Sequence, residues 1–65
     1  MTTTARIAVL LADFEDAVAA GDISGQLDAM LAAHEQDLTH PDGPRAMAAL
    51  KTAKARAAYE YDQAA

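Results

Sequence analysis

The stretch PRAMAALKTAKARAAYEYDQ, from Pro44 to Gln63, decides how this chain folds, because it is the basic, alanine-rich part of an otherwise acidic protein. Residues 1–44 carry a formal charge of −7 and residues 45–65 carry +2, which together give the net charge of −5. The first part also supplies most of the large apolar side chains. Opposite charges in two parts of one chain favour contact between them, either by folding back of the basic segment on the acidic part or by its contact with a neighbouring copy.

The Pro44–Gln63 stretch itself predicts a helix over residues 44–63. Pro44 suits the first turn, where its missing N–H is not needed, and Asp42 or Gly43 is expected to cap the helix. Residues 39–43 form the break before it, because Pro41 disfavours helical geometry at the preceding residue.

Before that break, the apolar spacing predicts two more helices, over residues 4–20 and 24–38. Thr3 or Thr4 is expected to cap the first, Gly21 to end it in a left-handed conformation, and Asp22 or Ser24 to cap the second. The connection is short, so these two helices should form an antiparallel hairpin. The side chains expected on the inner face of the second helix are Ile23, Leu27, Met30, Leu31, His34 and Leu38. On this basis Leu31→Ala should destabilise the fold by ~2–5 kcal/mol.

The predicted fold is therefore all-α and a single domain: an antiparallel helical hairpin plus a third, alanine-rich helix. Two arrangements of the third helix are open. It can close a three-helix bundle, or it can extend from the hairpin and dock on a neighbouring copy. One set of charges favours closure, because a turn about Pro41 would bring Arg45 beside Glu35 and Asp37. Those two carboxylates sit unfavourably near the end of their own helix.

The third helix also carries a stripe of small residues that would let another helix approach closely. The residues expected at a protein interface are Ala46, Ala49, Ala53, Ala57 and Tyr61, together with Val9 of the first helix, which lies off the main apolar stripe. The alternative is that alanine simply fills a helix of high intrinsic propensity.

No arrangement of residues indicates catalysis or a bound cofactor. Ser24 and His34 are about 15 Å apart along one helix, too far for a nucleophile and its base. His34, Asp37 and His40 lie near each other but lack the paired spacing of a metal site on a helix. His34 is expected to be a half-buried interface residue and His40 a loop residue. We therefore expect no catalytic residues, no metal site and no cofactor.

The chain contains 65 residues and no Cys, so it can build only a thin core and has no disulfide to support it. These limits predict a non-enzymatic protein–protein interaction module, a structural or adaptor subunit of a homo-oligomer or a larger assembly. An accessory protein of a phage-like particle fits this profile.

The alternative is a small regulator, either a nucleic-acid binder using Lys51, Lys54 and Arg56 or an acidic inhibitor of a basic site. The acidic balance disfavours nucleic acid and anionic membranes, and no apolar run is long enough for a span. The run MTTTARIAVLLADFE has helical spacing and early acidic residues, so it is expected to be a helix rather than a signal peptide, in a cytoplasmic protein.

Overall fold

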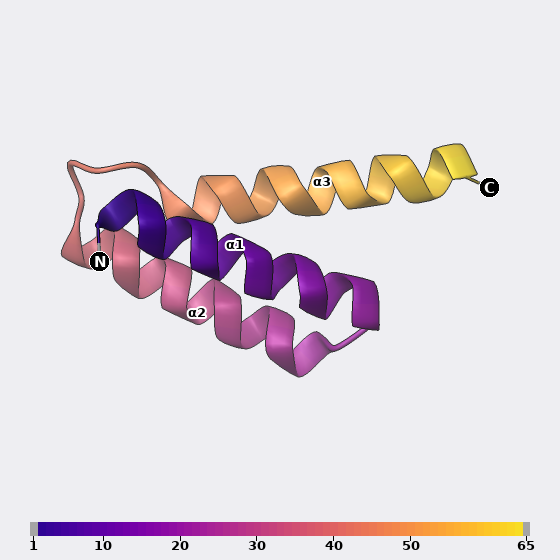
Figure 1. Ribbon diagram of the computed structural model, residues 1–65, viewed down its shortest axis with the longest axis horizontal. Helices are drawn as coiled ribbons and strands as arrows, with labels where there is room; N and C mark the ends of the chain where they lie inside the picture. The colour runs from indigo at the N-terminus through magenta and orange to yellow at the C-terminus, as the bar shows by residue number, and fades with distance from the viewer. Residues whose placement is uncertain (1, 65) are drawn as a thin grey trace.

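The computed structural model describes the backbone of residues 2–64 and the side chains of residues 2–60, and it contains three helices that pack against one another (Figure 1). They are α1 (Thr3–Ala20), α2 (Ile23–Thr39) and α3 (Ala46–Ala64). Helices α1 and α2 form the expected antiparallel hairpin. Helix α3 lies beside α1 and is parallel to it, so it is antiparallel to α2 (Figure 1). The all-α prediction is confirmed, and α3 closes a three-helix bundle while its last turns continue past the end of the hairpin.

The two ends of α1 show how local chemistry sets helix boundaries. The hydroxyl of Thr2 accepts a hydrogen bond from the backbone N–H of Ala5 at 3.1 Å, so Thr2 is the cap and the expectation of Thr3 or Thr4 is wrong. At the other end Gly21 adopts φ 68°, and its N–H turns back to the carbonyls of Ala17 and Val18. The predicted left-handed glycine is confirmed.

The first turn of α2 explains a glycine that looks unfavourable in the sequence. Asp22 caps α2, with its carboxylate accepting from the N–H of Gly25 at 2.9 Å. A Cβ atom on Gly25 would stand 2.5 Å from the other oxygen of Asp22 and 3.2 Å from the Cβ of Ala17 on α1. Gly25 therefore leaves room for both the cap and the close approach of α1.

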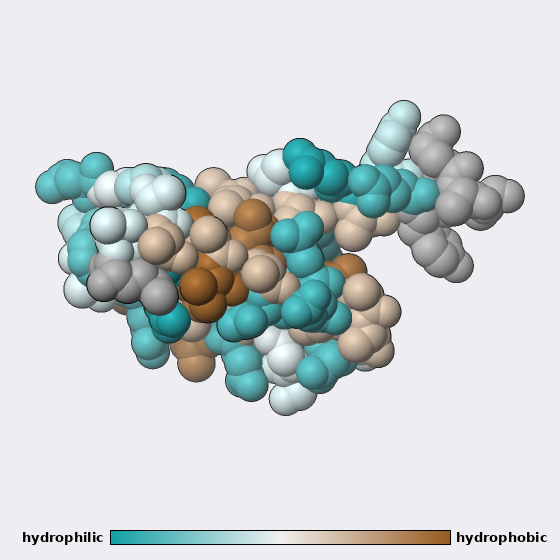
Figure 2. Space-filling model, in the orientation of Figure 1, coloured by the Kyte–Doolittle hydropathy of each residue, from teal (hydrophilic) through white to brown (hydrophobic). Residues whose placement is uncertain are grey.

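The core is built from a few large side chains set against many small ones. Phe14 and Leu50 are the largest fully buried residues, and Leu10 is buried with them. Among residues 2–60 the other buried positions are all alanine: Ala17, Ala29, Ala33 and Ala46. Apolar side chains visible on one face of the molecule gather along α1 and in the seam between α1 and α3 (Figure 2). Large residues from α1 and α3 thus fill the space that small residues of α2 leave.

The inner face predicted for α2 is wrong. Ile23, Leu27, Leu31 and Leu38 are 65%, 59%, 60% and 68% exposed. His34 is exposed as well, and only Met30 of that set packs partly against the core. The helix has two apolar faces, and the one with Ala29 and Ala33 lies inward. The reason is steric: Leu10, Phe14 and Leu50 already occupy the interior, so α2 can approach them only through small side chains.

Within the described part of the chain, none of the three helices combines the length and the apolar character needed to cross a membrane.

Candidate functional site

The most prominent surface feature is the outward face of α2, called here the α2 stripe and made of Ile23, Leu27, Leu31 and Leu38. At about 3.6 residues per turn, these four side chains fall within roughly 80° of the helix circumference. His34 lies inside the same arc. From Ile23 to Leu38 the stripe runs about 22 Å along the helix, at a rise of ~1.5 Å per residue.

The α2 stripe reverses the usual arrangement of an amphipathic helix. The inward side of α2 buries Ala29 and Ala33, whereas its four largest aliphatic residues, counted apart from Met30, face solvent. An ordinary helix of a small domain would do the opposite, because full burial of one Leu or Ile contributes about 1.5–3 kcal/mol. Sequence reasoning found these residues but assigned them to the interior. The signal for the alternative is the second, small-residue stripe on the other side of the same helix.

One edge of the α2 stripe is acidic. Leu31 follows Asp28 by three positions and precedes Glu35 by four, and such spacings make all three neighbours on the surface of a helix. Asp28 and Glu35 are both exposed, and α2 contains no Lys or Arg. The stripe is therefore bordered on this side by negative charge with no basic residue of the same helix to neutralise it.

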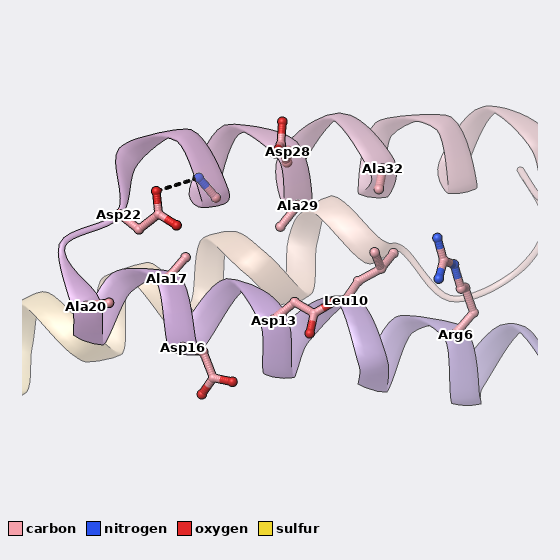
Figure 3. A pocket seen from close by; sticks show the side chains of 11 residues that line it. Arg6, Leu10, Asp13, Asp16, Ala17, Ala20, Asp22, Asp28, Ala29 and Ala32 are labelled. Atoms are coloured by element: carbon pink, nitrogen blue, oxygen red, sulfur yellow. Dashed lines mark hydrogen bonds between the residues drawn. The ribbon is translucent and has the colours of Figure 1, made fainter.

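The acidic edge continues into a shallow groove of about 530 Å³ between α1 and α2 (Figure 3). Leu10, Ala17, Ala29 and Ala32 supply its apolar lining. Four aspartates stand around it: Asp13 and Asp16 on α1, Asp22 before α2, and Asp28 on α2. Arg6 lines the opposite end of the groove. In Figure 3 the carboxylate of Asp28 points away from α1, so this residue lies between the groove and the α2 stripe.

A second carboxylate of α2, Asp37, joins two helices. One oxygen accepts from the backbone N–H of Ala46 at 2.7 Å, and the other accepts from that of Met47 at 3.1 Å. These are unpaired donors at the start of α3, so Asp37 is the cap of that helix and the expectation of Asp42 or Gly43 is wrong. The negative charge near the end of α2 is placed to meet the positive end of α3.

The same contacts change the acidity of Asp37. The hydrogen bond from Ala46 is the main cause that lowers the pKa of Asp37 below its ordinary value of 3.8, and the bond from Met47 adds to it. Partial burial opposes this lowering, while the charges of Arg45 and His34 support it. Arg45 thus acts on Asp37 through its charge. The expected pairing of Arg45 with the exposed Glu35 stays a prediction.

The small-residue stripe of α3 begins inside the bundle and becomes partly exposed along the helix. Ala46 has no exposed surface and belongs to the chain's own core, which corrects its assignment to an interface with another chain. Ala49, Ala53 and Ala57 are half-buried, and Ala53 packs against the core. A groove of about 820 Å³ separates this part of α3 from the end of α1, with Phe14 among its lining residues.

Two other residues are predicted to lie at an interface, Val9 on α1 and Tyr61 on α3. Val9 is 39% exposed and remains a candidate for contact with another chain. Tyr61 lies outside the residues whose side chains the structure describes.

The histidines form no recognisable metal site in the part of the chain that the structure describes, where no three His, Cys, Asp or Glu side chains are grouped to hold an ion. The Nδ1 atom of His40 lies 3.1 Å from the side-chain nitrogen of Gln36, one turn earlier. His34 is exposed on the α2 stripe, so its expected half-burial in the single chain is wrong.

No protein family, curated protein sequence or solved structure matches this chain.

Proposed function

We propose that this chain is a non-enzymatic protein–protein interaction module, a small structural or adaptor subunit that docks on another protein through the α2 stripe. The observation that carries the proposal is the outward placement of Ile23, Leu27, Leu31 and Leu38 on a helix whose inward face is alanine. Several large apolar side chains exposed along one helix face are uncommon on soluble monomers and typically mark an interaction site.

The energetics of a small domain support the same proposal. A chain of about 60 residues buries only about 60% of the surface that its unfolded form exposes. Here the four largest aliphatic residues of α2 stay mostly exposed, so their contribution to stability is largely unused. Covering each would contribute roughly 1–2 kcal/mol, since about three-fifths of the full ~1.5–3 kcal/mol is still available. A docked partner would therefore stabilise the fold as well as bind to it.

The test is the paired variant Leu27→Ser with Leu31→Ser, compared with Tyr59→Ser. Tyr59 is 65% exposed on α3, so the control removes a large side chain of similar exposure away from the stripe. Association would be followed as mass in light scattering at increasing concentration, and as proteins captured from the cells that produce the chain. We expect the stripe variant to lose association that the Tyr59 variant keeps. Equal association in both variants would contradict the proposal.

One observation favours the acidic form of the alternative regulator. Four aspartates gather around the groove between α1 and α2, as an acidic inhibitor of a basic site would require. Such an inhibitor would lose affinity steeply with salt even after the stripe is altered, whereas a docking module depends on the stripe. An accessory subunit of a phage-like particle is one assembly role that fits this proposal. A cytoplasmic setting also fits it, since the chain has no Cys and proteins of a reducing compartment rarely depend on disulfides.

A further inference from the structure

We infer that the partner presents a basic amphipathic helix to the α2 stripe, with its apolar face on Ile23, Leu27, Leu31 and Leu38 and its Lys or Arg side chains beside the acidic edge. The inference rests on the proposed function and names the chemistry of the partner. It depends on the dimensions of the stripe and on the charge that borders it.

The dimensions fit a single helix. The stripe is about 22 Å long and occupies roughly 80° of the circumference of α2, which is the contact that one straight helix makes with another over about four turns. Helix-on-helix docking through anchors at i, i+4 and similar spacings is a common mode of peptide recognition. The four exposed aliphatic residues provide such anchors along the whole length of α2.

The charge along the stripe selects a basic partner. Asp28 and Glu35 border the stripe on one edge, and Asp13 and Asp16 of α1 stand around the adjoining groove. A helix seated on the stripe would place the residues flanking its apolar face within reach of Asp28 and Glu35. Lys or Arg there would gain favourable interactions, whereas Asp or Glu would meet negative charge on the edge.

A second copy of the chain is the competing occupant, and the same charges disfavour it. In a symmetric antiparallel pair of α2 helices, the edge of one helix lies against the same edge of the other. The acidic edge that carries Asp28 and Glu35 would therefore face the acidic edge of the second copy. Like charges placed this way are destabilising. A parallel pair would avoid this contact but would align the two helix dipoles and bring together two segments that each carry −7.

Three synthetic peptides test the inference, each about 18 residues long so that the helix covers the stripe. The first has Leu on one helical face and Lys on the other. The second replaces every Lys by Glu. The third keeps the Leu and Lys content of the first but distributes Leu around the helix. Binding to the full chain would be measured by calorimetry at about 50 mM and about 300 mM salt, which changes screening between exposed charges.

We expect the Leu–Lys peptide to bind most tightly and to weaken with salt, and the Leu–Glu peptide not to bind. Leu27→Ser with Leu31→Ser should weaken the Leu–Lys complex by about tenfold or more. Asp28→Asn with Glu35→Gln should weaken it about three- to tenfold and reduce its salt dependence. The matched control is Glu15→Gln with Glu60→Gln, which removes the same charge from the groove between α1 and α3 and should leave binding unchanged.

Three results would overturn the inference: equal binding of the redistributed peptide, equal loss in the Glu15 and Glu60 control, or no binding of the Leu–Lys peptide. Light scattering of the chain alone separates these from failure of the proposed function. Self-association that strengthens with salt and disappears in the Leu27 and Leu31 variant would leave the docking role of the stripe intact. In that case the occupant is a second copy rather than a basic helix.

Discussion

The carboxylate of Asp37, near the end of α2, accepts a hydrogen bond from the backbone N–H of Ala46 at 2.7 Å, so that a residue of α2 caps the start of α3. This contact crosses the loop and fixes where α3 begins relative to α2. We expect Asp37→Ala to lower the melting temperature, because two N–H groups at the start of α3 lose their acceptor. The comparison is Asp42→Ala, which removes an exposed aspartate of the loop. Equal melting temperatures of the two variants would contradict the capping role.

The effect of Asp37→Ala should depend on pH. Folding lowers the pKa of Asp37, so its contribution is fully present above the ordinary value of 3.8 and is lost as the pH falls through the lower folded-state value. The gap in melting temperature between wild type and variant should therefore be largest near pH 7 and shrink as the pH is lowered below the ordinary value of 3.8. Thermal unfolding followed by circular dichroism across this pH range measures the change. A gap that does not change with pH would show that charge is not involved.

Leu31→Ala should lower the free energy of unfolding by at most about 1 kcal/mol, because Leu31 is 60% exposed and only about two-fifths of the ~1.5–3 kcal/mol of full burial is realised. Leu50→Ala removes the same atoms from a position that is 2% exposed and should destabilise by ~2–5 kcal/mol. Urea unfolding of the two variants measures the difference. If Leu31→Ala lowered the free energy of unfolding as much as Leu50→Ala, the aliphatic face of α2 would have to be buried in the folded chain.

The opposite substitution should be harmful on the other side of α2. Ala33 has no exposed surface, so Ala33→Leu would push α2 away from its neighbours and should destabilise by ~1–3 kcal/mol. The control is Ala12→Leu, at an exposed position of α1 where the added atoms meet solvent. If both variants unfold at the same urea concentration, the interior of the bundle has room for a leucine side chain at position 33, which would contradict close packing there.

Gly25→Ala should not give the gain of about 1 kcal/mol that replacing glycine in an open helix provides. Its Cβ would contact Ala17 and the capping carboxylate of Asp22 at once. Urea unfolding of Gly25→Ala should show unchanged or lower stability. The full gain would mean that the start of α2 shifts freely away from α1.

Some of this structure could be predicted from the sequence because it depends on local chemistry. Gly21 and Pro41 mark the breaks between helices whatever surrounds them, and the three helices begin or end within two residues of their expected positions. Apart from the cap of α1, the wrong predictions concern contacts between helices. Hydrophobicity alone places Leu31 inward, but the space left by Phe14 and Leu50 accepts only small side chains there.

The candidate site shows the same limit. The aliphatic residues of α2 and the carboxylate of Asp37 are visible in the sequence, but their roles depend on which helix lies beside them. In the sequence alone, Asp37 is an unfavourable negative charge near the C-terminal end of α2. It becomes favourable only because the N-terminal end of α3 lies next to it in the fold. The caps expected at Thr3 or Thr4 and at Asp42 or Gly43 are wrong because the observed acceptors are the preceding residue Thr2 and, for α3, Asp37 of another helix.

The alanine-lined interior has a calorimetric consequence. Unfolding this chain would expose comparatively little apolar surface, so its heat capacity change should fall at or below the ~0.8–1 kcal/mol/K typical of a domain this size. A small heat capacity change and a small unfolding enthalpy give a flat stability curve and a broad melting transition. A partner that covers the α2 stripe would enlarge both quantities, so its binding should sharpen the melting transition as well as raise its midpoint.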